Sequence, residues 1–178
     1  LLEIVSEPEI RSSNEAYQYL IEIRKLVRYL DICDGNMEEG SLRCDANVSV
    51  RIKGEKKFGT KVEVKNMNSI RNVKNAIDFE INRQIDVLEN GKKVIHETRG
   101  FNAATGKTLS QRHKEEANDY RYFPEPDLQP VIISQKYVDD IKGSLPPLPK
   151  ELLEKFTSEF KLSNYDAKLV PVIKNRTV

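Results

Sequence analysis

The sequence predicts an α+β fold in which an antiparallel sheet is covered on one face by helices and is followed by the start of a helical domain. Three observations predict it: two runs of alternating apolar and polar residues, two longer stretches with apolar residues at helical spacing, and a proline-rich boundary near residue 146. With 178 residues, of which 38% are hydrophobic, the chain can bury one substantial core. We expect one unit over residues 1–134, and a linker with the first helices over residues 135–178.

The chain opens with Leu1, Leu2, Glu3, Ile4 and Val5, four apolar residues around one acid, which predicts a strand. Because this run starts without a methionine, we expect a further portion upstream of Leu1. Residues 12–15 form a capping box, and the apolar residues that follow at helical spacing predict an amphipathic helix over residues 13–30.

The central part of the chain predicts a hairpin with one apolar and one polar face. From Leu42 to Arg51 apolar residues alternate with Arg43, Asp45, Asn47 and Ser49. After a turn at residues 53–57, a second run alternates in the same way: Val62 and Val64 face one side, and Lys61, Glu63 and Lys65 face the other.

A second helix and a second hairpin are predicted next. Asn68 and Ser69 can cap a helix that runs to a stop at residues 90–91, and a hairpin is expected at residues 93–101 and 107–113. The apolar stripe of this helix consists of Ile70, Val73, Ile77, Ile81, Ile85 and Leu88. Both helices are expected to cover the apolar face of the sheet and to leave the polar face open.

The last third of the chain is punctuated by proline. Residues 119–127 are too rich in proline for a helix and too aromatic for a disordered tail. Pro146, Pro147 and Pro149 mark a boundary, after which the sequence has a helical start but is too short for a domain of its own.

Charge and cysteine content limit the function classes. Lys and Arg number 29 against 28 Asp and Glu, so the net charge of +1 gives no overall attraction to nucleic acid, and a polyanion would have to meet a local patch. Cys33 and Cys44 form neither a disulfide framework nor a metal-ligand spacing, which predicts a reducing, cytoplasmic compartment. No apolar run reaches the roughly 18 residues of a membrane span.

The polar face of the first hairpin carries the candidate chemistry. It comprises Arg43, Asp45 and Asn47 on one strand, Glu63 and Lys65 on the other, and Asn66 and Asn68 just beyond. Carboxylates suit Mg²⁺, while Arg and Lys hold phosphate oxygens. By composition alone, a charged face that is merely solvated is the commoner case. The mixture of Arg, Asp and Asn favours a ligand, because these side chains offer donors and acceptors of fixed geometry.

Two other motifs favour structural roles. Five residues separate Gly100 from Gly106, where a phosphate-binding loop requires four, so a hairpin loop is favoured. His96 and His113 lack the spacing of a metal pair and are expected to be surface or structural residues, although a phosphate contact by His113 stays open.

Five segments resemble the B-subunit family of the tRNA-dependent aspartyl/glutamyl-tRNA(Asn/Gln) amidotransferases. They are residues 2–8, 37–47, 58–61, 63–66 and 119–127, and the resemblance is strongest from Leu1 to about Ser134. It implies a partial cradle domain similar to glutamine synthetase. It also implies an enzyme, a ligase, that uses ATP and Mg²⁺ to phosphorylate the side-chain carboxylate of the misacylated amino acid and then amidates it with ammonia from a glutaminase partner.

The resemblance also implies roles for individual residues. Glu3 matches a magnesium ligand, and Asp45 and Glu63 match acidic positions of the catalytic pocket. Chemistry and position add Arg43, Asn47, Lys65, Asn66 and Asn68 as ligand or phosphate contacts. The implied partners are the glutaminase subunit of the amidotransferase, which is of the amidase type, its small third subunit and misacylated tRNA, with no membrane.

The chain departs from the family at both ends. The resemblance implies that the N-terminal half of the cradle lies before Leu1 and that most of the helical and tail domains lie after residue 178, so we expect the fragment to be inactive by itself. Residues 170–172 place a proline where the family continues as helix.

Three alternatives stay open at this point. An archaeal paralogue acts only on Glu-tRNA(Gln) and would carry an inserted domain like one of bacterial aspartyl-tRNA synthetases, which is not visible here. A non-catalytic module that holds tRNA or a partner protein is the alternative from another class. The sequence also leaves open whether Asp-tRNA or Glu-tRNA is the substrate.

Overall fold

The computed structural model describes residues 2–113, 127 and 129–173, and it divides into two units, Leu1–Ala117 and Asn118–Val178. No described helix is long and apolar enough to cross a membrane. The predicted boundary near residue 134 stays a prediction, because most of residues 114–128 lie outside the described part of the chain.

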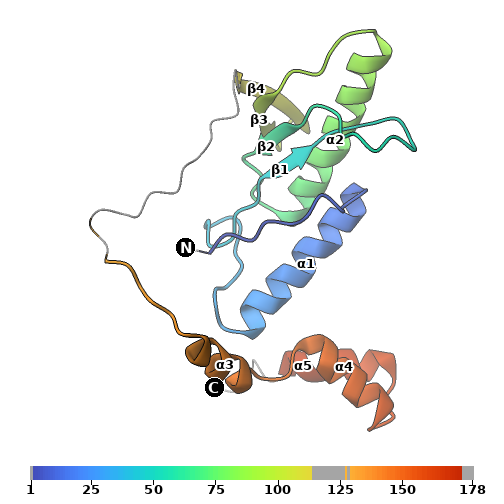
Figure 1. The fold of residues 1–178 in the computed structure, drawn as a ribbon. Coiled ribbons are helices and arrows are strands. Elements are labelled where there is room, and N and C mark those ends of the chain that lie inside the picture. Colours follow the sequence, from blue (N-terminus) through green and yellow to red (C-terminus); the bar gives the residue numbers. More distant parts are fainter. Residues whose placement is uncertain (1, 114–126, 128, 174–178) are drawn as a thin grey trace. The chain divides into compact units, whose positions relative to one another are not determined.

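The first unit confirms the predicted α+β class (Figure 1). Its described elements are α1 (Ser13–Tyr29), β1 (Ala46–Val48), β2 (Val62–Lys65), α2 (Ile70–Glu89), β3 (Glu97–Asn102) and β4 (Lys107–His113). The four strands form one sheet in the order β1-β2-β3-β4. Neighbours in this sheet are therefore also neighbours in sequence, and α2 is the only helix inserted between two of the strands.

The sheet is mixed, whereas two hairpins alone predicted antiparallel pairing throughout. The pairs β1–β2 and β3–β4 are antiparallel, as expected, but β2 and β3 run parallel. The physical reason is α2, because a strand followed by a crossover helix returns to its sheet in the original direction. This pairing places residues of β3 beside residues of β2, and the sequence of neither hairpin alone could predict which residues become neighbours.

Strand pairing before β2 is less extensive than the sequence patterns predicted. In the first hairpin only Ala46–Val48 pairs, although side-chain exposure alternates over residues 42–48 as predicted. The strand predicted at the start of the chain is wrong. Residues 2–7 pair with no strand of the described chain, and the side chains of Leu2 and Val5 are 69% and 81% exposed. Apolar residues alone do not make a strand, because its backbone groups need a partner strand for their hydrogen bonds.

Both helices of the first unit begin where their caps predicted. The hydroxyl of Ser12 accepts a hydrogen bond from the Glu15 amide at 3.2 Å, and that of Ser69 accepts one from the Asn72 amide at 3.1 Å. The second helix ends at Glu89, directly before the predicted stop. Local capping chemistry therefore fixes the ends of the elements that flank β1 and β2.

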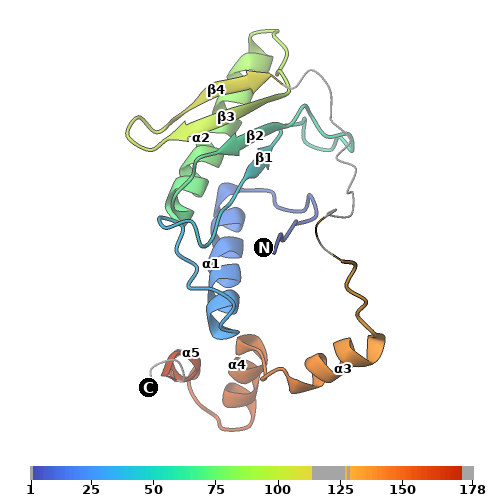
Figure 2. The ribbon, with the colours of Figure 1, turned by 90° about the vertical axis from the view of Figure 1, so that its left-hand side faces the viewer.

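The core lies between the helices and one face of the sheet, as expected. It is formed by buried side chains from α1, α2, three strands and the β2–α2 connection: Leu20, Val48, Val64, Met67, Val73, Ala76 and Phe101. Figure 2 shows α2 crossing behind the strands. Because valines of β1 and β2 point into this core, their sequence neighbours are turned to the uncovered face.

The predicted apolar stripe of α2 is confirmed as far as Ile81, which packs against the core, and is wrong for its last two residues. Ile85 and Leu88 are 39% and 46% exposed, whereas Glu80 and Gln84 are fully buried. The part of the sheet that faces this end of α2 presents charged and hydroxyl groups, so polar helix residues fit there with hydrogen-bond partners.

The second unit contains three helices in its described part: α3 (Gln135–Ser144), α4 (Pro149–Ser158) and α5 (Asn164–Ile173). Pro146 and Pro147 lie between the first two, and Pro149 is the first residue of α4, a position that tolerates proline. The predicted helical start is confirmed, and α5 continues through Pro171. The proline-rich motif at residues 119–127 lies outside the described residues except for Asp127.

Candidate functional site

The uncovered face of β1 and β2 carries the central residues of the predicted site. Asn47 of β1 lies opposite Glu63 of β2 in the antiparallel register, and Asp45 immediately precedes β1. Val62 and Val64 have no exposed surface, and this burial turns Glu63 and Lys65 to the opposite face. The predicted alternation therefore places these polar groups side by side.

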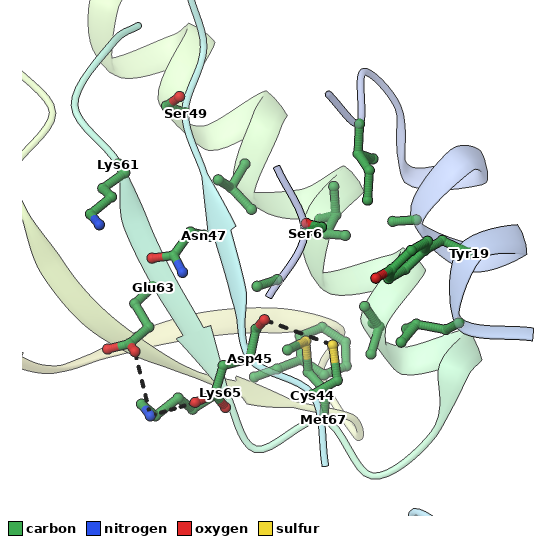
Figure 3. Close-up of a pocket in the computed structure, with 18 of the residues that line it drawn as sticks. Ser6, Tyr19, Cys44, Asp45, Asn47, Ser49, Lys61, Glu63, Lys65 and Met67 are labelled. Atoms are coloured by element: carbon green, nitrogen blue, oxygen red, sulfur yellow. Dashed lines mark hydrogen bonds and ion pairs between the residues drawn. The ribbon is translucent and has the colours of Figure 1, made fainter. Parts of the chain in front are cut away.

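An ion cluster joins three of the predicted residues (Figure 3). The ammonium nitrogen of Lys65 lies 2.6 Å from Oδ2 of Asp45 and 3.5 Å from Oε1 of Glu63. The hydrogen bond to Asp45 raises the pKa of Lys65; burial opposes this shift, and the charges of both acids add to it. The cluster thus holds two carboxylates around one cation at a partly exposed surface.

Thr98 of β3 completes the surroundings of Glu63. It is the parallel-strand partner of Glu63, its hydroxyl donates a hydrogen bond of 2.9 Å to Oε2 of Glu63, and the residue is only 3% exposed. One oxygen of Glu63 therefore faces Lys65 while the other is held by Thr98. Sequence reasoning missed Thr98, because its place beside Glu63 depends on the β2–β3 register.

Two side-chain amides lie next to this cluster. Gly100 pairs with Lys65, and a Cβ at Gly100 would lie 3.0 Å from Nδ2 of Asn66 and 2.5 Å from Nε2 of Gln111. Asn66 adopts a left-handed conformation with φ 65°, which turns the chain at the end of β2. The glycine leaves room for both amides on the uncovered face. Gln111 was not predicted, and it sits where the register between β3 and β4 shifts.

The other predicted residues stand apart from the ion cluster. Oδ1 of Asn68 accepts a hydrogen bond of 2.7 Å from Asn72, and Arg43 lies beside the turn at Gly40. Glu3 lies on the extended segment before α1. One broad hollow of the first unit is nevertheless lined by all eight predicted residues: Glu3, Arg43, Asp45, Asn47, Glu63, Lys65, Asn66 and Asn68.

The donor set of the cluster suits Mg²⁺ with part of its shell supplied from outside. The described residues contain no group of three or more His, Cys, Asp and Glu side chains that could hold a metal. Asp45 and Glu63 instead form a pair around the position that Lys65 fills. Magnesium commonly takes one or two protein carboxylates and completes its shell with water and substrate phosphate, so this pair fits the ion. Glu3 as a further ligand stays a prediction.

A buried ionic network lies behind the same sheet. The fully buried carboxylate of Glu80 accepts hydrogen bonds from Arg83, at 2.6 and 3.0 Å, and from Thr108 of β4 at 3.1 Å. Arg99 of β3 lies 3.6 Å from it. These contacts attach α2 to the far strands by charged groups rather than by apolar packing.

The network extends to Glu97 and to β1. Arg99 donates to Glu97 at 2.6 Å, and Ser110 donates a short hydrogen bond to the same carboxylate. Burial alone would raise the pKa of Glu97, but these hydrogen bonds and the neighbouring arginines lower it. Nε2 of Gln84 donates to the backbone oxygen of Val48 at 3.0 Å and so ties α2 to the strand that carries Asn47.

The two motifs interpreted as structural contribute no described side chain to the ion cluster. Residues 100–108 form the end of β3, a turn and the start of β4, which confirms the hairpin. His96 is half-buried just before β3, and His113 is the last residue of β4, with a side chain outside the described set. By its fold and site, the first unit is an α+β domain with a polar, ligand-accessible sheet face.

Comparison with known proteins identifies the family. The family described as "GatB/GatE catalytic domain" matches residues 1–139. Proteins named as the B subunit of aspartyl/glutamyl-tRNA(Asn/Gln) amidotransferase are similar to most of the chain. The protein of Thioalkalivibrio sulfidiphilus is 58% identical over 94% of this chain, and that of Pseudomonas entomophila is 57% identical over 96%; each match covers 35% of the relative. That of Thermodesulfovibrio yellowstonii is 54% identical over 96% of this chain and 36% of its own length.

The chain belongs to the GatB/GatE catalytic domain family. This confirms the resemblance on which the expectations above were based. The chain spans about a third of the length of the curated relatives it matches. The activity of a whole B subunit, with its substrates and partners, is therefore a matter for proposal.

Proposed function

We propose that this chain forms part of an amidotransferase B subunit that uses ATP and Mg²⁺ to activate the side-chain carboxylate of Asp or Glu on misacylated tRNA and then amidates it. The observation that carries the proposal is the Asp45–Lys65–Glu63 cluster on an uncovered sheet face. Its support from outside the structure is the name shared by relatives that are more than half identical to the chain. In this proposal the cluster is the place where phosphate and metal meet.

The chemistry needs an activating step because a free carboxylate is a poor electrophile. A carboxylate oxygen attacks the terminal phosphorus of ATP, and ADP leaves; ammonia then attacks the acyl carbon, phosphate leaves, and the amide forms with loss of a proton. A bound Mg²⁺ neutralises charge on the transferring phosphoryl group. Asp45 and Glu63 would hold this ion, and the ammonium of Lys65 would lie beside the phosphate oxygens.

The remaining predicted residues receive supporting roles. Glu3 would complete the metal site, while Arg43, Asn47, Asn66 and Asn68 would contact phosphate or the amino acid. The oxygen of Asn68 already accepts a hydrogen bond from Asn72, so its contact to a ligand would be as a donor. All of them line the broad hollow that contains the cluster, as do many other residues of the first unit, so these roles are supported chiefly by their chemistry and by the family resemblance.

The partners follow from the same proposal. Ammonia would come from the glutaminase subunit, of the amidase type, accompanied by the small third subunit, in the cytoplasm, and misacylated tRNA would be the substrate. The two free cysteines accord with a reducing compartment. We expect the 178-residue chain alone to be inactive, because it spans about a third of the length of the curated relatives it matches.

The test uses a hybrid complex. In it, this chain replaces the matching segment of the Pseudomonas entomophila relative, which is co-expressed with the glutaminase subunit and the small third subunit. Asp45→Asn and Glu63→Gln should abolish ATP-dependent amidation of misacylated tRNA while glutamine hydrolysis persists. Glu89→Gln, at the exposed end of α2, is the control and should change neither activity.

Two results would contradict the proposal. Amidation at the unaltered rate in Asp45→Asn and Glu63→Gln would remove both residues from the reaction. Calorimetric titration of the hybrid complex with Mg²⁺ and ATP provides the second measurement. Binding of tRNA without any nucleotide site would favour the alternative of a non-catalytic module.

A further inference from the structure

The loop that joins β1 to β2 concentrates positive charge. Residues 49–61, here named the basic loop, contain one acidic residue, Glu55, and five basic residues: Arg51, Lys53, Lys56, Lys57 and Lys61. The loop thus carries a net charge of +4 in a chain whose total is +1. In the part of the chain that the structure describes, none of the five cations forms an ion pair. Nothing within the described first unit therefore accounts for this concentration of charge.

Arg51 holds the basic loop in a defined shape. Its Nη1 donates a hydrogen bond of 2.7 Å to the backbone oxygen of Lys56, and its guanidinium lies 4.6 Å from the centre of the Phe58 ring. These two contacts join the outgoing and returning arms of the loop. The loop is therefore preorganised, which lowers the entropy cost of binding a ligand.

Two glycines make the same shape possible. A Cβ at Gly59 would overlap the backbone oxygen of Val50, so only glycine allows the two arms to approach so closely. Gly54 has φ 95°, and the amide of Glu55 bonds to the oxygen of Ile52 at 3.1 Å, which closes the turn at the tip. A merely solvated lysine-rich loop would need neither feature.

The basic loop also exposes large apolar side chains. Ile52 is 76% exposed and Phe58 is 49% exposed, and both have cations close by in sequence. Proteins that bind single-stranded nucleic acid combine cations along the backbone with aromatic side chains on which bases stack. The Phe58 ring already contacts Arg51 but is still half exposed, so it can also meet a ligand. An acidic protein surface would pair with the same cations, and the place of the loop beside the ion cluster is what favours RNA.

The position of the basic loop connects it to the ion cluster. Lys61 immediately precedes β2 and, as Figure 3 shows, lies along the same strand as Glu63 on the uncovered face. Both line the same hollow, together with Arg51, Lys53 and Phe58. A strand of RNA that lies along the loop would therefore reach the cluster with its end.

We propose that the basic loop binds the unpaired end of the RNA that carries the amino acid, with lysines at its phosphates and Phe58 under a base. This inference rests on the proposed function for the identity of the RNA. It assigns the loop to RNA binding and not to the chemical step. The lysines contribute sequence-independent attraction to phosphate, which falls as salt rises.

The experiment removes charge at the tip of the basic loop in the hybrid complex. The triple variant Lys53→Gln, Lys56→Gln, Lys57→Gln is compared with a matched control, Lys92→Gln, Lys93→Gln, Lys107→Gln, whose exposed lysines also form no ion pair among the described residues. The affinity for tRNA that carries no amino acid is measured over a series of salt concentrations. The loop variant should bind about ten- to hundredfold more weakly. The slope of its log affinity against log salt concentration should be smaller by about 2, because three phosphate contacts are lost. The control should match the unaltered complex.

Kinetics and a single substitution test the two parts of the proposal. With the triple variant, KM for misacylated tRNA should rise, while kcat at saturating tRNA and KM for ATP stay unchanged. Phe58→Leu keeps an apolar side chain but removes the ring, and it should weaken binding of a single-stranded RNA about fivefold or more.

The outcomes separate this inference from the proposed function. If the triple variant binds tRNA as tightly as the control, the basic loop is not the RNA contact, and the proposed function is unaffected. If instead the variant loses its partner proteins during gel filtration with RNA binding intact, the loop is a protein interface, and the inference is overturned. If the unaltered hybrid complex fails to bind tRNA even at low salt, both proposals are overturned.

Discussion

The hydroxyl of Thr98 holds one carboxylate oxygen of Glu63 at 2.9 Å across the parallel strands β2 and β3. The other oxygen faces the Lys65 ammonium at 3.5 Å. Carboxylates that bind metals are commonly oriented by such second contacts, whose loss costs about ten- to a hundredfold in metal affinity or activity. Thr98 therefore acts on the proposed site through Glu63, as a positioning residue.

Replacement of Thr98 by valine tests this relationship. Valine keeps the branched shape of threonine in a position that is 3% exposed but cannot donate a hydrogen bond. We expect Thr98→Val to lower kcat for amidation in the hybrid complex about ten- to hundredfold and to raise the Mg²⁺ concentration needed for half-maximal rate. Steady-state assays at a series of Mg²⁺ concentrations measure both quantities.

Thr98→Ser is the control for that substitution. Serine retains the hydroxyl and loses only a methyl group, so most of the activity and the Mg²⁺ dependence should be restored. A merely structural role would give the opposite order, since serine leaves a small cavity and valine does not. Equal kcat and Mg²⁺ dependence in all three proteins would remove Thr98 from the site.

Lys65 should compete with a divalent cation for the two carboxylates. Its ammonium lies between Asp45 and Glu63, where a metal ion bound by both would also lie. Lys65→Met removes the competing charge, so in the absence of nucleotide the hybrid complex should bind Mg²⁺ more tightly, while ATP-dependent amidation falls. Calorimetric titration with Mg²⁺ measures the first effect. Lys93→Met, which removes an exposed lysine outside the basic loop that forms no ion pair among the described residues, is the control. An affinity for Mg²⁺ that drops with Lys65→Met would contradict the competition.

The buried carboxylate of Glu80 should matter for stability more than any exposed acid. Glu80→Gln removes a fully buried negative charge from beside Arg83 and Arg99, whose side chains are 21% and 13% exposed, and leaves Glu97 as their remaining acidic partner among the described residues. Loss of one partner from such a network costs about 3–5 kcal/mol. Urea unfolding of the 178-residue chain, followed by circular dichroism, should show this loss for Glu80→Gln. For the exposed Glu89→Gln the change should stay within about 0.5 kcal/mol. A similar midpoint for both variants would show that the network contributes little.

Particular residues show what the sequence could and could not predict. Alternation over residues 42–48 and the caps at Ser12 and Ser69 are local, so the exposed face of β1 and the starts of both helices were predicted correctly. The place of Thr98 depends on the register of two strands separated by a 20-residue helix, which no local pattern contains. Glu80 was missed for a related reason, since a charged residue on a helix predicts exposure until its partners on other elements, Arg99 and Thr108, are known.

The thiol of Cys44 should make the stability of the chain depend on alkaline pH. Burial raises the pKa of Cys44 to about 11, and the neighbouring charge of Asp45 adds to the shift. Between about pH 9 and pH 11 the unfolded chain loses this proton while the folded chain keeps it. The unfolded state therefore binds fewer protons, and the free energy of unfolding falls by about 1.4 kcal/mol per pH unit in that window.

Cys44→Ala isolates this contribution from the titration of lysines and tyrosines in the same range. Urea unfolding of the parent chain and of the variant is measured from pH 7 to pH 11. Above pH 9 the free energy of unfolding of the parent chain should fall more steeply with pH than that of the variant. Below pH 9 the difference between the two free energies should be close to constant. Absorbance of the thiolate near 240 nm provides an independent reading, and the Cys44 signal should appear only near pH 11 in the folded chain. Parallel stability curves would mean that the thiol ionises as readily when folded as when unfolded, and that its packing against the apolar core does not exclude water from the sulfur.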